Sequence, residues 1–215
     1  MEQGVVPSDR NRATQWVLFD VGGVLIEWDD TIIFHKVANR YGVNQDVATR
    51  ILTRRRRELQ SGRISLREFW SRFARSLAIP MPENWRSLWV APFARLVRPR
   101  NDVLDLAADL RKNGVRTGLF SNTDSAHWRE LRSRGWFDDF HPQIVSFRLG
   151  TVKPNQQAFR RAAKIFPPGE GWPVLVDDSV RNVEGARAAG WEALHFTSAR
   201  ALRHELRGRR MLSSN

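Results

Sequence analysis

Four groups of polar side chains stand at or just beyond the ends of predicted strands, where the chain could carry out chemistry. They are Asp20, the pair Ser121-Asn122, Lys153 and the pair Asp177-Asp178. Because the carboxyl ends of parallel strands share one edge of a sheet, these groups can converge although they lie far apart in the sequence. We therefore treat them as one candidate site.

The residue types of this set favour metal-assisted chemistry on a phosphorylated substrate. Three carboxylates brought together would repel one another unless a positive charge lay among them. Mg²⁺ suits such a place, because it takes hard oxygen ligands and pairs carboxylates with substrate phosphate. Lys153 offers a point charge for a phosphate oxygen or for a nucleophilic carboxylate. Ser121 could donate to a phosphate oxygen, and Asn122 could orient the substrate or a loop.

Each group also has a simpler interpretation when it is taken alone. Asp20 could cap a strand, Ser121-Asn122 could form a turn or a helix cap, and Lys153-Pro154 could be a surface turn. Asp177-Asp178 is the strongest single signal, because two adjacent acids after an apolar strand incur repulsion. The ordered set of four is more specific than any of its members.

The elements that must position these groups alternate between strand-like and helix-like segments. The apolar run before Asp20 predicts a strand buried on both faces, and Gly22-Gly23 can supply the turn after it. Further strands are expected at 115–120, 144–147, 174–176 and 193–196. Helices are expected from a cap at Asn101 to a stop at Asn113-Gly114, and at 125–134, 155–165, 180–189 and 198–208. This order predicts an α/β fold with a Rossmann-like parallel sheet.

Residues 28–96 interrupt the alternation with helical patterns and no convincing strand. The helices are expected at 30–41, at 45–60, after Ser65, which forms an S-x-x-E capping pattern with Glu68, and at about 83–95. We therefore expect a core of residues 15–27 and 97–215, an inserted helical cap of residues 28–96, and a loose tail of residues 1–14.

Composition bounds the class of protein. The 215 residues carry a net charge of +12 and no cysteine, which excludes disulfides and thiolate chemistry. The first residues lack a signal-peptide profile and no apolar run is long enough to span a membrane, so we expect a cytoplasmic location. Only four of the 35 basic residues are lysines. The basic runs 54–57 and 203–210 fit solvated helix faces better than a nucleic-acid site, since no nucleic-acid module is recognisable.

The chain resembles the haloacid dehalogenase-like hydrolase superfamily. The resemblance rests on four motifs, which are FDVGGVL, FSN, GTVKP and VLVDDSVRNVEGARAAG. It covers nearly the whole chain and is most specific in the last two motifs. The segment 28–96 is similar to the small helical C1 cap of the branch that includes glucose-1-phosphate phosphatase and the N-terminal phosphatase domain of soluble epoxide hydrolase.

The resemblance implies a role for each candidate residue. Asp20 would attack phosphorus and form an aspartyl-phosphate, while Ser121 and Lys153 would stabilise the transferring group. Asp178 would be the main acidic Mg²⁺ ligand beside Asp20, with Asp177 close by. The implied substrate is a small phosphomonoester, such as a sugar phosphate. Neither a membrane nor a nucleic acid is expected as a partner.

Gly22 is the one serious departure from the family pattern. Phosphatases of this family usually carry an Asp two positions after the nucleophile, as general acid and base. The carbonyl of Gly22 could still bind Mg²⁺, but the proton-transfer role is vacant unless Asp29, Asp30 or His35 fills it. Trp28, His35 and Trp70 could shape the pocket, although the helical spacing of Trp70 with Phe73 and Leu77 also fits a cap core.

Two alternatives to a phosphatase remain open at this point. In an L-2-haloacid dehalogenase the same Asp attacks carbon and needs neither a second Asp nor a metal, which suits Gly22 but leaves Asp177-Asp178 unexplained. A protein that has kept the fold and lost catalysis would serve as a binding module, and the basic surface fits that interpretation.

Overall fold

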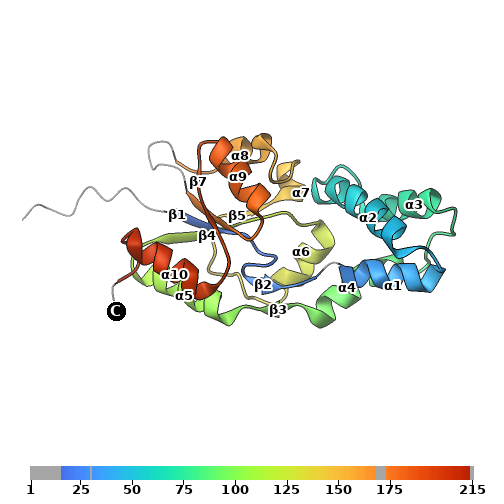
Figure 1. Cartoon of the computed structure of the whole chain (residues 1–215), viewed down its shortest axis with the longest axis horizontal. Helices are drawn as coiled ribbons and strands as arrows, with labels where there is room; N and C mark the ends of the chain where they lie inside the picture. Colours follow the sequence, from blue (N-terminus) through green and yellow to red (C-terminus); the bar gives the residue numbers. More distant parts are fainter. Residues whose placement is uncertain (1–15, 30, 168–172, 214–215) are drawn as a thin grey trace, which may run out of the picture.

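A five-stranded parallel sheet forms the centre of the molecule (Figure 1). The computed structural model describes residues 16–29, 31–167 and 173–213, so the predicted tail 1–14 lies outside the described residues. The strands are β1 (Trp16–Phe19), β4 (Arg116–Ser121), β5 (Gln143–Val145), β6 (Val174–Asp177) and β7 (Glu192–His195), in the order β5-β4-β1-β6-β7. All four neighbouring pairs are parallel, which confirms the predicted α/β fold.

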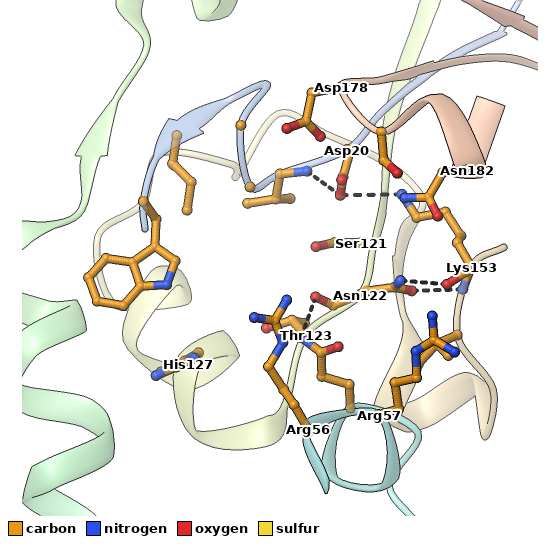
Figure 2. A pocket seen from close by; sticks show the side chains of 18 of the residues that line it. Asp20, Arg56, Arg57, Ser121, Asn122, Thr123, His127, Lys153, Asp178 and Asn182 are labelled. Atoms are coloured by element: carbon orange, nitrogen blue, oxygen red, sulfur yellow. Dashed lines mark hydrogen bonds and ion pairs between the residues drawn. The ribbon is translucent and has the colours of Figure 1, made fainter. Parts of the chain in front are cut away.

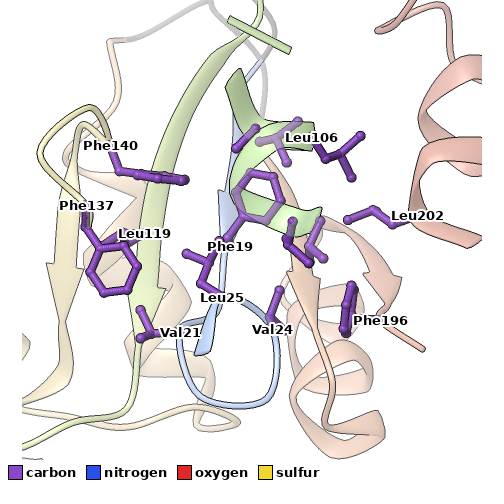
Figure 3. Close-up of a cluster of buried hydrophobic side chains, with 14 of the residues drawn as sticks. Phe19, Val21, Val24, Leu25, Leu106, Leu119, Phe137, Phe140, Phe196 and Leu202 are labelled. Carbon is purple, nitrogen blue, oxygen red and sulfur yellow. The ribbon is translucent and has the colours of Figure 1, made fainter. Parts of the chain in front are cut away.

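Helices cover both faces of this sheet because β1 is apolar on both of its sides. Val17 and Phe19 point into one cluster of buried side chains (Figure 3) and Leu18 points into another. The first cluster lies under α5 (Asn101–Lys112) and α10 (Ala199–Gly208), and the second under α8 (Gln156–Ala163) and α9 (Val180–Ala188). The interior strands β1, β4 and β6 are therefore buried along most of their length.

Four helices are inserted between β2 (Ile26–Glu27) and β3 (Arg98–Pro99), which pair with each other in antiparallel fashion. They are α1 (Thr31–Tyr41), α2 (Gln45–Gln60), α3 (Leu66–Ser76) and α4 (Trp85–Leu96). They bury a cluster of their own, to which Trp70 and Phe73 belong, so the core interpretation of Trp70 is confirmed. Ser65 and Glu68 form the predicted capping box at the start of α3. In Figure 1 these helices project from one side of the sheet.

A few local predictions were wrong. The ribbon β2–β3 was missed, since two residues per strand are too few to show an alternating pattern. Asn101 is the first residue of α5, and Arg100 takes the cap position. The strand predicted at 144–147 ends at Val145, because Ser146 begins the short helix α7 (Ser146–Leu149). Within the described residues, every helix is too short or too polar to cross a lipid bilayer.

Candidate active site

The candidate residues meet at one edge of the sheet, where the adjacent strands β4, β1 and β6 end. Ser121 closes β4, Asp20 follows β1 and Asp177 closes β6, while Lys153 comes from the loop between α7 and α8. They border a cavity of about 450 Å³ (Figure 2), a size that suits a small molecule. Of the residues predicted for the site, this cavity is lined by Asp20, Gly22, Ser121, Asn122, Lys153 and Asp178.

Lys153 holds two of the carboxylates together. Its Nζ lies 2.5 Å from Oδ2 of Asp177 and 3.3 Å from Oδ1 of Asp20, and it donates to the carbonyl of Phe120 at 2.5 Å. The lysine side chain is fully buried. Burial alone would lower its pKa, but the charges of Asp177 and Asp20 outweigh that effect and raise it. Lys153 is therefore held as a cation directly beside Asp20.

Asp20 is held in an environment that disfavours its charge. Burial raises the pKa of Asp20 to about 7, and Asp177 and Asp178 add to the rise, while Lys153 opposes it. Oδ1 of Asp20 also accepts a hydrogen bond of 2.7 Å from the N–H of Val21. A divalent cation would favour the charged carboxylate and so remove this cost.

Asp20, Asp177 and Asp178 each offer an oxygen within 4.8 Å of the others, which is close enough to share one ion. This set of hard oxygen donors fits Mg²⁺. Burial, followed by the charge of Asp177, raises the pKa of Asp178 as well. The carboxylate of Asp178 occupies the space beside Gly23, where a Cβ would lie 2.0 Å from its Oδ2. Gly23 therefore makes room for the most accessible acid of the trio.

Asp177 is already satisfied by the protein. Its Oδ2 binds Lys153, and its Oδ1 accepts hydrogen bonds from the N–H of Ser179 at 3.0 Å and from Nδ2 of Asn182 at 2.9 Å. Asp177 is completely buried beneath the cavity. Its geometry suits orienting Lys153 and the loop before α9 better than direct contact with a substrate. Asn182 could not be identified from the sequence, because its role depends on this contact between α9 and the end of β6.

The side chain of Asn122 is likewise engaged by the backbone. Its Nδ2 donates to the carbonyl of Lys153 and its Oδ1 accepts from the N–H of Lys153, both at 2.9 Å. This reciprocal pair clamps the Lys153 loop against the end of β4. Of the two roles considered for Asn122, orienting a loop therefore fits the geometry better than binding substrate.

The match to known families decides the class of this chain. Residues 14–190 match the haloacid dehalogenase-like hydrolase family. The chain belongs to this family. A search of curated proteins found no match. This chain is 21% identical in sequence to a HAD family enzyme from Bacteroides thetaiotaomicron. The two structures have a TM-score of 0.71, and the match covers 90% of this chain and 98% of that one.

Two further solved structures share the fold. A HAD phosphatase from Thermococcus onnurineus is 21% identical, with a TM-score of 0.60 over 90% of this chain and 98% of that one. An L-2-haloacid dehalogenase from Xanthobacter autotrophicus, with chloropropionic acid covalently bound, is 19% identical, with a TM-score of 0.59 over 93% of this chain and 85% of that one. Similarity at these sequence identities establishes the fold of this hydrolase. Its reaction has to be inferred from the residues of the site.

The inserted helices supply one wall of the cavity in this hydrolase. Thr53, Arg56, Arg57 and Gln60 of α2 line it, so the run 54–57 is not simply a solvated face as expected. Of the three residues that the sequence suggested could shape the pocket, Trp28 lines the cavity, whereas Trp70 and His35 do not. His127, which no sequence pattern indicated, also lines the cavity. Its ring is stacked against those of Trp89 and Phe93, with centroids 5.0 and 4.2 Å away.

Neither described candidate for the missing acid reaches the cavity. Asp29 and His35 are absent from its lining, and Asp30 lies outside the described residues. Oδ1 of Asp29 accepts a hydrogen bond from the N–H of Thr31 at 2.9 Å, and the hydrogen bonds from Thr31 lower the pKa of Asp29. The Asp29 carboxylate therefore stabilises the first turn of α1, and it is charged at neutral pH, so it has no proton to donate.

Proposed function

We propose that this family hydrolase is a Mg²⁺-dependent phosphatase acting on a small phosphomonoester, such as a sugar phosphate, through an aspartyl-phosphate on Asp20. The observation that carries the proposal is the buried Lys153 cation between Asp20 and Asp177, with Ser121 and Asp178 facing the same cavity. A HAD family enzyme from Bacteroides thetaiotaomicron, 21% identical with a TM-score of 0.64, has been crystallised with magnesium and inorganic phosphate, which supports this choice.

The chain's residues divide the reaction into two displacements at phosphorus. A carboxylate oxygen of Asp20 attacks phosphorus as the ester P–O bond breaks, and the electron pair leaves with the alcohol oxygen. A water molecule then attacks phosphorus, and the bond between phosphorus and Asp20 breaks, which releases phosphate and restores the carboxylate. The alcohol oxygen takes a proton from solvent, and water supplies the proton and the oxygen gained by the products. Lys153 and the hydroxyl of Ser121 would stabilise charge on the phosphoryl oxygens.

Mg²⁺ would be held by Asp20, Asp178 and the carbonyl of Gly22, and when bound it neutralises charge on the phosphate. Asp177 would not contact the substrate. It would orient Lys153 and Asn182, with which it forms hydrogen bonds. In this proposal residues 28–96 serve as the cap that encloses the substrate, and the protein works in the cytoplasm. A cavity of about 450 Å³ favours a small substrate over a nucleic acid.

The two ring nitrogens of His127 are engaged by Asp124 and by the carbonyl of Trp89, so within the described residues the cavity provides no spare acid to protonate a leaving group. Its only acidic lining residues within the described chain are Asp20 and Asp178, both assigned to the reacting phosphate and the cation. General acid catalysis contributes about two to four orders of magnitude, so poor leaving groups would react slowly. We therefore favour phosphates on acetal-type carbons, whose oxygen leaves more readily than a simple alkoxide.

A screen of purified protein against sugar phosphates, nucleotides and p-nitrophenyl phosphate, with and without Mg²⁺, tests the proposal. We expect turnover that depends on Mg²⁺ and is greatest with a sugar phosphate. Release of chloride from 2-chloropropionate without metal would favour the dehalogenase alternative. No turnover on any phosphate would favour a binding protein.

Stability should depend on pH and Mg²⁺ through Asp20. Because the folded state raises its pKa from 3.8 to about 7, Asp20 contributes stability that is full below pH 4 and is lost as the pH rises through 7. Without Mg²⁺, Asp20→Asn should therefore raise the Tm at pH 8 and leave it nearly unchanged at pH 4. Mg²⁺ should raise the Tm of the wild type more at pH 8 than at pH 5. Equal effects at the two pH values would contradict this account.

Gly23→Ala should damage the cation site specifically. Gly23 has a φ of +79°, and the added methyl would collide with Asp178. Gly42→Ala is the matched control, because Gly42 has a φ of +60° and open space around it. Both variants should lose about 1–2 kcal/mol of stability from backbone strain. Only Gly23→Ala should also weaken Mg²⁺ binding, measured by calorimetry, and equal affinities in the two variants would exclude the role given to Gly23.

A further inference from the structure

The cavity has three arginines besides the lysine that serves the reacting phosphate. Arg56, Arg57 and Arg181 line it, while Lys153 is paired with Asp20 and Asp177. We propose that the substrate carries a second anionic group, a carboxylate or another phosphate, which Arg57 binds with the help of Arg56. This inference rests on the proposed phosphatase function and specifies its substrate class.

The two arginines face the reaction centre from the inserted helices. They are consecutive residues of α2, and in Figure 2 both side chains extend from that helix toward Ser121 and Asn122, with Asp20 and Asp178 beyond. A phosphomonoester whose phosphate lies at Asp20 would therefore extend its other end toward α2. The arginines occupy the place where a distal group would lie.

Arg57 has no counter-charge within the described part of the chain. No ion pair involves its guanidinium there, and the neighbouring acid Glu58 is taken by Arg72 at 2.9 Å and Arg55 at 3.5 Å. Lys153, in contrast, is neutralised by Asp177 and Asp20. A guanidinium with five donors matches a carboxylate or phosphate in bidentate geometry. Arg57 is exposed and lines the cavity, so its guanidinium is open to a ligand anion.

Contacts with the core fix the position of α2 over the cavity. Nε2 of Gln60 donates to the carbonyl of Asn122 at 3.2 Å, and the hydroxyl of Ser146 donates to the carbonyl of Gln60 at 2.6 Å. Just beyond the helix, a Cβ on Gly62 would lie 2.4 Å from the carbonyl of Phe147, so the two backbones are in close contact. The backbone that carries the two arginines, one turn earlier, is thus held beside the cavity before a ligand binds.

Aryl phosphates isolate this subsite from the missing acid, because a phenolate leaves without protonation. We would compare phenyl phosphate with 4-carboxyphenyl phosphate and 1,4-phenylene bisphosphate, in the presence of Mg²⁺. The wild type should show a KM about 10- to 100-fold lower for one or both doubly anionic substrates, since hydrogen bonds to charged groups contribute that much. The two substrates distinguish a carboxylate from a second phosphate.

Arg57→Gln should remove most of this preference, and Arg56→Gln part of it, while the KM for phenyl phosphate changes less than about threefold. Arg55→Gln is the control, because Arg55 lies on the same helix, pairs with Glu58 and does not line the cavity. It should leave the KM values for all three substrates unchanged. If Arg57→Gln raised all KM values equally, or if the wild type showed no preference, the inference would be overturned.

A binding measurement separates failure of this inference from failure of the phosphatase proposal. Wild-type protein with Mg²⁺ is titrated by calorimetry with benzylphosphonate, 4-carboxybenzylphosphonate and 4-(phosphonomethyl)phenylphosphonate. All three carry phosphorus bonded to carbon, so none of them is hydrolysed. Tighter binding of either doubly anionic ligand that is lost in Arg57→Gln supports the subsite even if no phosphate is turned over. Equal binding of all three refutes it even where phenyl phosphate is hydrolysed rapidly.

Discussion

Asp20→Asn should abolish phosphatase activity, lowering kcat by about four orders of magnitude or more, as removal of a covalent nucleophile does elsewhere. An amide cannot attack phosphorus, although it has nearly the size of the carboxylate. Hydrolysis of p-nitrophenyl phosphate with Mg²⁺ measures the loss. The complex with Mg²⁺ and beryllofluoride, which mimics the aspartyl-phosphate, should disappear as well.

The structure predicts that this variant still folds. Lys153 keeps its contacts with Asp177 and with the carbonyl of Phe120, so the buried cation retains partners. Asp29→Asn is a suitable control, because Asp29 is exposed and outside the cavity lining, and it should keep activity within about twofold. Substantial turnover by folded Asp20→Asn protein would show that the covalent mechanism is wrong.

Gly22→Asp should increase the hydrolysis of alkyl phosphates by about 10- to 100-fold, part of the two to four orders of magnitude that general acid catalysis can supply. Gly22 lines the cavity, and a Cβ on it would meet no atom within 4 Å. The new carboxyl could therefore face the leaving oxygen. The measurement is kcat/KM for glycerol 1-phosphate and for p-nitrophenyl phosphate in both proteins.

The gain should be confined to poor leaving groups. Nitrophenolate needs no proton to leave, so its rate should change by less than about threefold. Gly22→Asn, which has the same shape but no transferable proton, should improve neither substrate. A loss of activity on both substrates in Gly22→Asp, with Mg²⁺ affinity unchanged, would show that the proton role is not what this position lacks.

The sequence was most informative where short-range physics decides the structure. The apolar run before Asp20 and the run before Asp177 form strands buried on both faces, and their carboxyl ends had to meet at one edge. Ser65 and Glu68 marked the start of α3, because a capping box needs only residues one turn apart. The family motifs matched the same strand ends, so the fold and the convergence of the candidate residues at one sheet edge could both be predicted.

The sequence was least informative about residues whose roles depend on distant partners. Asn122 follows β4 whether it binds substrate or clamps a loop, and only its two hydrogen bonds with the backbone of Lys153 distinguish these roles. The run 54–57 is equally consistent with a solvated face and a cavity wall. Which of its arginines face inward depends on the angle at which α2 packs over the core, set by Gln60 and Gly62.

The sequence by itself therefore determined the α/β fold, the family and the candidate nucleophile Asp20, since periodicity and motif spacing are local properties of the chain. Tertiary structure decided that Lys153 lies between Asp20 and Asp177, that Asp178 rests against Gly23, and that Arg56 and Arg57 face the cavity. The first two facts join core segments that meet when the strands pair, and the third depends on how the inserted helices pack against the sheet edge. Distances across such an interface depend on the packing of both parts and cannot be deduced from either segment alone.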